Sequence, residues 1–158
     1  MDVHKKTISY CVKTADGTRV QQGNVAATRA ALRAWAKQLP RSWIGALEAT
    51  LFTGWIYDHL QPYAQQLKVA HPAMLKAIAA SKKENDRVDA GKLSDLLRAN
   101  LLPECYIAPR PLRELRRVLR YRNLVVRQAL RMKNKISGLL LETGTLHSKE
   151  KLRGRRYS

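Results

Sequence analysis

The sequence predicts a mixed α/β domain followed by one long basic helix. Three observations support this prediction. A strong turn signal, Asp16-Gly17, lies between two segments of β-type composition, which favours a β-hairpin. Short apolar runs then alternate with helical segments, as expected of a sheet flanked by helices. Beyond a connector with three prolines, apolar residues recur at steps of three and four through residues 112–141, which indicates a helix.

The individual elements follow from local signals. Thr28 is a suitable cap for a helix that ends at Pro40, and a second helix is expected to stop before Pro62. Short apolar runs between breakers predict buried strands. The predicted strands are, in order, residues 7–12, 18–25, 42–49 and 66–70. The predicted helices are residues 28–40, 53–60, 72–80, 86–100 and 112–141, with a polar loop at 81–85.

The net charge of +18 favours a polyanionic partner. Nucleic acid is the first candidate and an anionic membrane surface is the second. Residues 110–158 carry 15 Lys and Arg against three acids, whereas residues 1–109 carry 15 against nine. We therefore expect a globular domain at 1–109, a basic helical or coiled-coil arm at 110–145 and a basic tail at 146–158.

Other features narrow the class of protein. The two cysteines, Cys11 and Cys105, form no zinc-binding pattern and are expected to be reduced thiols of a cytoplasmic protein. No run of 18 apolar residues predicts a transmembrane helix, and the start of the chain lacks the apolar core of a signal peptide. We expect no membrane partner.

Four carboxylates stand where a metal site could use them: Asp2, Glu48, Asp86 and Asp89. Asp86 and Asp89 lie three residues apart on a predicted helix and so share a face. Carboxylate oxygens hold two Mg²⁺ ions about 3.5–4 Å apart in phosphodiester chemistry. Each acid also has a simpler interpretation, as a chain-end residue, a solvent-facing strand end or a partner of the helix dipole.

Three short motifs together carry a family resemblance. Residues 2–7 (DVHKKT), 47–50 (LEAT) and 85–90 (NDRVDA) occur in a fixed order that resembles the N-terminal domain of the DEDD transposases, the IS one-ten family of insertion sequences. The similarity covers roughly residues 2–145. It implies an RNase H-like, RuvC-like fold, with Asp2, Glu48, Asp86 and Asp89 as the ligands of two Mg²⁺ ions.

The same resemblance implies DNA as substrate, a structured guide RNA as partner and a bacterial or archaeal, nucleoid-associated location. We expect Asp2 and Glu48 on adjacent strands, with Asp86 and Asp89 on a helix that crosses the strand ends. Two departures from the family pattern stand out. Because only Met1 precedes Asp2, the first strand is nearly missing and Asp2 is expected to be weakly held. The C-terminal serine domain of the family is not found, so we expect this chain alone to be inactive or only partly active.

Basic residues near the first acid and along the long helix are candidate phosphate contacts. Lys5 and Lys6 lie beside Asp2. The helix carries Arg110, Arg113, Arg116, Arg117, Arg120, Arg122, Arg127, Arg131, Lys133 and Lys135. The alternative is a solvated helix face, but only Glu114 and Glu142 are available to pair with these cations, which favours nucleic-acid contact. The apolar seam of the helix also predicts pairing with another copy as a homo-oligomer.

The sequence therefore predicts the metal-dependent, RuvC-like portion of a transposase or recombinase. Two alternatives stay open. The chain could be a non-catalytic nucleic-acid-binding fragment, which Mg²⁺ titration against binding would reveal. It could also be a stand-alone nuclease of the Holliday-junction type, which cleavage of a four-way junction would reveal.

Overall fold

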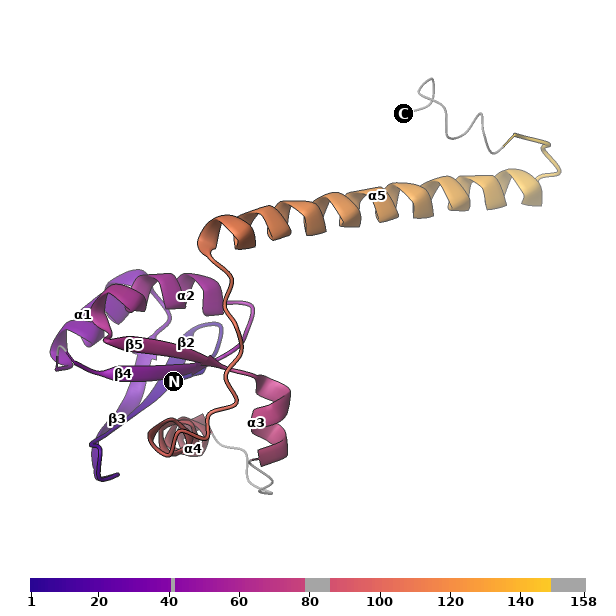
Figure 1. The fold of residues 1–158 in the computed structure, drawn as a ribbon. Coiled ribbons are helices and arrows are strands. Elements are labelled where there is room, and N and C mark those ends of the chain that lie inside the picture. The colour runs from indigo at the N-terminus through magenta and orange to yellow at the C-terminus, as the bar shows by residue number, and fades with distance from the viewer. Residues whose placement is uncertain (41, 79–85, 149–158) are drawn as a thin grey trace. The chain divides into compact units, whose positions relative to one another are not determined.

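The computed structural model describes residues 1–40, 42–78 and 86–148, with the backbone alone described for residues 86–89. The chain divides into two compact units, Met1–Ile107 and Ala108–Ser158. The first unit is a mixed α/β domain, which confirms the predicted class. Figure 1 shows its strands between helices.

Three antiparallel strands form the first part of the sheet: β1 (Asp2–Val3), β2 (Thr7–Lys13) and β3 (Arg19–Ala26), in the order β1-β2-β3. The hairpin between β2 and β3 turns where the sequence predicts, with Gly17 at a φ of 96° that suits glycine. The hydroxyl groups of Thr14 and Thr18 donate to the Asp16 carboxylate. These hydrogen bonds lower the pKa of Asp16.

Two parallel strands form the second part: β4 (Ile44–Glu48) and β5 (Gln66–Ala70). The N-terminal residue joins the two parts. The Met1 nitrogen donates to the Ala46 carbonyl at 2.8 Å, and the Glu48 nitrogen donates to the Met1 carbonyl at 3.3 Å. This is the bonding pattern of a parallel pair, so β1 runs beside β4 and the strands lie in the order β3-β2-β1-β4-β5.

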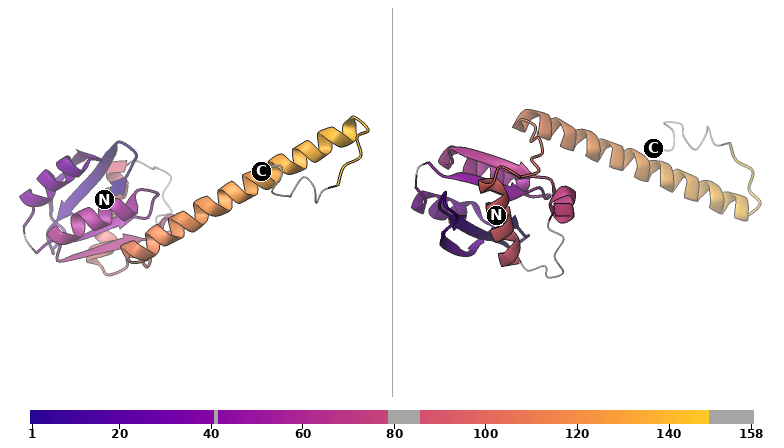
Figure 2. Two further views of the ribbon diagram at one scale, coloured as in Figure 1. Left: turned by 90° about the horizontal axis from the view of Figure 1, so that it is seen from above. Right: turned by 60° about the horizontal axis from the view of Figure 1, so that its bottom comes forward.

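Helices cover both faces of the sheet. Helices α1 (Arg29–Gln38) and α2 (Thr53–Leu60) bury Leu32 and Ile56 against the side chains of Ile8 and Leu47. On the other face, α4 (Asp86–Arg98) packs Leu93 against Ala46 and Ala70. The right-hand view of Figure 2 turns this second face forward. A residue of β1 or β4 therefore faces either the α1–α2 layer or α4, according to the alternation of the strand.

Gly45 of β4 leaves room for an aromatic ring. A Cβ atom at this position would lie 3.0 Å from Leu67 Cδ1 and closer still to the Trp43 ring. Gly45→Ala is therefore expected to destabilise the domain by about 1–3 kcal/mol through overpacking. Denaturant unfolding followed by tryptophan fluorescence measures this, since all three tryptophans, Trp35, Trp43 and Trp55, lie in this unit.

Gly91 of α4 provides the matched control, because nothing lies within 4 Å of a Cβ atom built there. Gly91→Ala is expected to stabilise the domain by about 0.5–1 kcal/mol, since alanine forms helix better than glycine. An equal effect of the two substitutions would contradict this description of the β4 packing.

The second unit contains one long helix, α5 (Arg110–Glu142), of 33 residues. Its C-terminal segment returns onto the helix, where the Ser137 hydroxyl and His147 Nε2 lie 2.7 Å apart. Apolar side chains along α5 stay largely exposed, among them Leu115, Val118, Leu119, Val125, Val126 and Met132. In the described part of the chain, no helix is both long and apolar enough to cross a membrane.

The predicted elements agree closely with the structure in most places. The bounds of α2 and β5 match the expectation, and α5 contains residues 112–141. The chain continues past α2 in a 3₁₀ turn, Gln61–Tyr63, that accommodates Pro62 at a first-turn position. Helix α3 (Pro72–Ile78) covers most of the predicted 72–80 segment, and the predicted loop at 81–85 lies outside the described residues, as do residues 149–158 of the predicted tail.

Candidate functional site

Asp2 and Glu48 lie on neighbouring strands and face the same side of the sheet. Met1 and Val3 are buried among the residues that pack under α1 and α2, so Asp2, between them, faces the opposite side. Leu47 likewise packs toward α1 and α2, whereas Ala46 packs toward α4, and Glu48 shares the side of Ala46. The hydrogen bonds of Met1 to β4 set the two acids side by side along the sheet.

The first acid is firmly held, and the expectation of a weakly held Asp2 was wrong. Asp2 is only 9% exposed, and it lies opposite Ser9 of the neighbouring strand β2. Met1 hydrogen-bonds to β4 on the other side of the same short strand. Two residues of strand are enough here because each side of β1 has a hydrogen-bonded neighbour.

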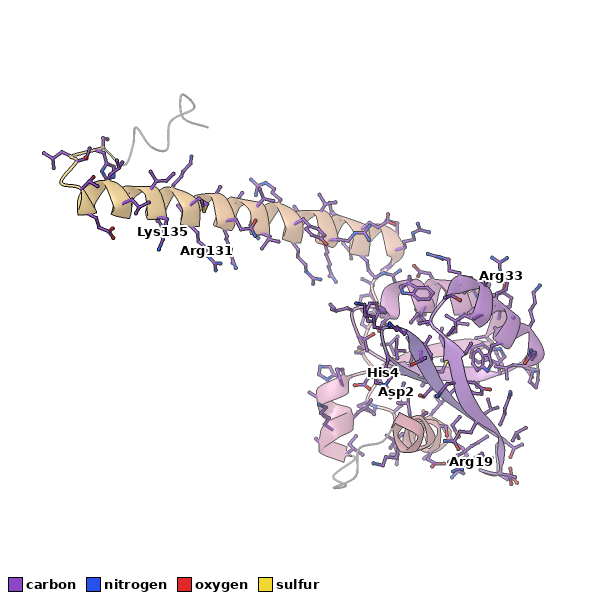
Figure 3. All side chains as sticks on the ribbon, turned by 180° about the vertical axis from the view of Figure 1, so that it is seen from behind. Asp2, His4, Arg19, Arg33, Arg131 and Lys135 are labelled. Carbon is purple, nitrogen blue, oxygen red and sulfur yellow. The ribbon has the colours of Figure 1, made fainter. Side chains whose placement is uncertain are left out.

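His4 lies beside Asp2, although the sequence analysis did not name it as a candidate. Its Nε2 lies 3.0 Å from Asp2 Oδ2, and its side chain is 46% exposed against 13% for Asp2. The turn that follows β1 places it there, since the His4 nitrogen donates to the Thr7 carbonyl at 2.9 Å. Figure 3 shows the two labelled side chains together. Its nearness to Asp2 in the sequence is a signal, but this nearness does not by itself predict the contact.

The α-amino group of Met1 lies close to both acids. Burial lowers its pKa to about 5, against smaller raising effects from Asp2, Cys11 and Glu48. The amino group is consequently mostly uncharged near neutral pH. It contributes little positive charge to offset the carboxylates of Asp2 and Glu48.

A hydrogen-bonded turn fixes the end of β4 beside Glu48. The Thr53 hydroxyl donates to the Glu48 carbonyl at 3.1 Å, and the Thr50 nitrogen donates to the same hydroxyl at 2.6 Å. Thr53 is buried and opens helix α2. The turn therefore ties the backbone of Glu48 to a helix of the opposite layer.

Helix α4, which contains the other two predicted acids, packs against this face of the sheet. The helix begins at Asp86, with Asp89 three residues later, and it contacts β1, β2 and β4. Lys13 Nζ lies 2.5 Å from Asp95 Oδ1, an ion pair that links β2 to α4 with a lysine side chain only 11% exposed. The side chains of Asp86 and Asp89 lie outside the described residues.

The two described acids at this face have part of the chemistry that Mg²⁺ requires. Asp2 and Glu48 offer carboxylate oxygens, the donors that hard divalent cations prefer. Among the described side chains, no three or more His, Cys, Asp or Glu groups could together hold a metal ion. Four carboxylates would be available only when the side chains of Asp86 and Asp89 are added to the described pair.

Lys5 and Lys6, the basic candidates beside the acids, are exposed in the turn between β1 and β2. The Lys6 carbonyl accepts a hydrogen bond from the Ala27 nitrogen at 2.9 Å, which fixes the turn. The two lysines therefore stand on a fixed backbone, close in the sequence to Asp2 and His4.

Two of the basic candidates on α5 make hydrogen bonds to nearby residues, and most of the others are exposed. Arg110 Nε donates to Glu114 at 2.9 Å, and Arg113 donates to the Ala108 carbonyl at 3.0 Å. The ion pair with Arg110 lowers the pKa of Glu114. Lys133 is half-buried. The remaining candidates are exposed: Arg116, Arg117, Arg120, Arg122, Arg127, Arg131 and Lys135. Figure 3 shows Arg131 and Lys135, one turn apart, on the same side of the helix.

One comparison with known proteins identifies a relationship. A family model described as a transposase, of the DEDD type associated with IS110, matches residues 1–145. The match covers both units and includes all four candidate acids and the whole of α5. No curated protein matches the chain.

Proposed function

Since the chain belongs to the DEDD transposase family, which acts on DNA, we propose that Met1–Ile107 is an RNase H-like, RuvC-like nuclease domain. The antiparallel sheet β1-β2-β3 and the parallel pair β4-β5, joined by the hydrogen bonds of Met1 and covered by helices on both faces, support this fold. The proposed reaction is metal-dependent cleavage of DNA strands during transposition. The site is the face of the sheet that α4 covers.

One observation carries the proposal. Two carboxylates 46 positions apart in the sequence, Asp2 and Glu48, are placed on adjacent strands and on the face against which α4 packs. Two acids of like charge on neighbouring strands repel one another, and a bound cation would offset their repulsion. In a chain with a net charge of +18, such a concentration of negative charge indicates a specific role.

Each residue has a proposed role in the reaction. Asp2, Glu48, Asp86 and Asp89 would hold two Mg²⁺ ions, which when bound activate the attacking oxygen and stabilise the leaving oxygen. His4 holds the Asp2 carboxylate in one orientation through its hydrogen bond. Lys5 and Lys6 bind the phosphate next to the scissile bond and orient the strand.

The proposal extends to the second unit. The exposed arginines of α5 bind the phosphate backbone, and its apolar residues pair with a second copy of the chain. The helix has too few acids to neutralise its own cations, which supports the first role. A structured guide RNA, implied by the family resemblance, is the further proposed partner.

Nicking of supercoiled DNA tests the proposed reaction. Of the two outcomes expected of this chain alone, inactivity and partial activity, the proposal requires the second: the wild-type chain nicks plasmid DNA weakly with Mg²⁺ or Mn²⁺ but not with a chelator. Asp2→Asn and Glu48→Gln are each expected to lower the nicking rate by about 100-fold or more, because a bound metal contributes several kcal/mol of charge stabilisation. Gel electrophoresis of the relaxed circle measures the rate.

Asp16→Asn is the matched control, since Asp16 is an exposed acid at the tip of the β2–β3 hairpin. This variant is expected to nick at the wild-type rate. DNA that stays intact with the wild-type chain in both metals would contradict the proposal. Nicking by Asp2→Asn at the wild-type rate would place the reaction elsewhere in the protein.

A further inference from the structure

Helix α1 carries three cations on one flank: Arg29, Arg33 and Lys37. We call these residues the α1 stripe. They are spaced four residues apart, so they follow one another at about 6 Å along the helix and span about 12 Å. All three are exposed, whereas Leu32, Trp35 and Ala36 of the same helix are buried in the core. The stripe thus forms a continuous basic edge on the surface of the domain.

The stripe is not neutralised by carboxylates of its own helix, since α1 contains no Asp or Glu. The ion pairs that described residues form with one another involve other cations, namely His4, Lys13, Lys68 and Arg110. An ordinary solvated helix gains stability from i, i+4 pairs of opposite charge, but here the i, i+4 neighbours are like charges that repel. A polyanion on this surface would remove that repulsion.

One member of the stripe is held in place. The guanidinium of Arg29 lies 5.6 Å from the centre of the Trp55 ring, a cation–π contact with α2. The Arg29 carbonyl also lies 2.8 Å from His59 Nε2. Less side-chain entropy is lost when such a fixed cation binds a ligand.

The stripe and the candidate acids lie on opposite sides of the sheet. The α1–α2 layer packs against Ile8 and Leu47, whereas Asp2 and Glu48 face α4. Figure 3 shows Arg33 pointing outward from α1, far from Asp2 and His4. Duplex DNA has a persistence length of about 150 base pairs, so one duplex does not fold around the sheet to reach both faces without a large bending cost.

We propose that the α1 stripe binds the phosphate backbone of a second DNA duplex, separate from the duplex at the acid-bearing face. This inference rests on the proposed function, which assigns the first duplex to that face. One strand of duplex DNA carries a charge about every 3.4 Å along the axis, so the 12 Å stripe spans roughly four successive phosphates, enough for each of its three cations to reach one. Strand transfer joins two DNA segments, and a surface on each face of one domain holds both of them at once.

The test uses the full 158-residue chain and two charge-matched double variants. Arg33→Gln with Lys37→Gln removes two cations from the stripe and keeps good helix formers, while Arg29 keeps its contact with Trp55. Arg19→Gln with Lys76→Gln removes two exposed cations elsewhere in the same unit. Each protein is bound to an immobilised duplex and then offered a second, fluorescent duplex at several salt concentrations.

The stripe variant is expected to bind the first duplex as well as the control variant does. Its capture of the second duplex should fall about tenfold or more below that of the control near 0.1 M salt. The slope of log K against log salt for that second step should flatten by about 1.8, or 0.9 for each lost contact. Unchanged helical circular dichroism would show that α1 still forms.

Equal capture by the two double variants would overturn the inference while leaving the proposed function in place. Selective loss of a structured RNA, with capture of the second DNA duplex intact, would also overturn it, because the stripe would then serve RNA. If the wild-type chain binds no duplex at all, the proposed function fails and this inference fails with it.

Discussion

Replacing Arg113, Arg116, Arg117 and Arg120 with alanine is expected to flatten the slope of log K against log salt for duplex binding by roughly three to four units. Each cation that contacts a phosphate releases condensed counterions and contributes about 0.9 to that slope. Arg116, Arg117 and Arg120 are exposed, while Arg113 donates to the Ala108 carbonyl and so adds least if that bond persists. Fluorescence anisotropy with a labelled duplex at several salt concentrations measures the slope.

The competing role of α5 is association with a second copy. Leu119 and Val126 are about half exposed on a helix whose apolar positions follow a seven-residue repeat. If α5 only pairs subunits, the four arginine changes leave the salt slope unaltered, and Leu119→Lys with Val126→Lys dissociates the oligomer in sedimentation experiments. If α5 binds phosphate, Arg116 and its neighbours set the slope whatever the oligomeric state.

Local signals were sufficient to predict most of the fold. Thr28 caps α1 as expected, with its hydroxyl accepting a hydrogen bond from the Ala31 nitrogen at 3.3 Å. The Asp16-Gly17 turn formed because glycine reaches a φ of 96° at no steric cost. These features depend on neighbours in the sequence alone. Residue types and their spacing are therefore enough to predict the helix cap and the turn.

The support of the site was not predictable in the same way, because it depends on pairing between distant segments. β1 has two residues, too few for a recognisable hydrophobic pattern, and it is held by hydrogen bonds to Ser9 on one side and to β4 on the other. The contact between His4 and Asp2 arises from the turn after β1. No periodicity in the sequence reports such a turn.

A bound divalent cation is expected to raise the unfolding temperature of the first unit by about 5–10 °C. At ten times the dissociation constant, a ligand of the native state stabilises it by about 1.4 kcal/mol, and 1 kcal/mol moves the midpoint of a domain this size by roughly 4–8 °C. Tryptophan fluorescence follows the relevant transition, since Trp35, Trp43 and Trp55 all lie within Met1–Ile107. The wild-type chain is heated with increasing Mn²⁺ or Mg²⁺ and with a chelator.

Asp2→Asn and Glu48→Gln are expected to abolish this shift, because each removes a charged ligand, whereas Asp16→Asn should keep the whole of it. Comparing the unfolding temperatures of the variants and the wild type without metal separates a residue that binds the metal from one with a purely structural role. Asparagine at position 2 retains an oxygen that can accept a hydrogen bond from His4 and removes repulsion from Glu48, so the metal-free variant should unfold within a few degrees of the wild type. A structural Asp2 would give the opposite pattern: a large loss of stability without metal, and the same metal-induced shift in the variant as in the wild type.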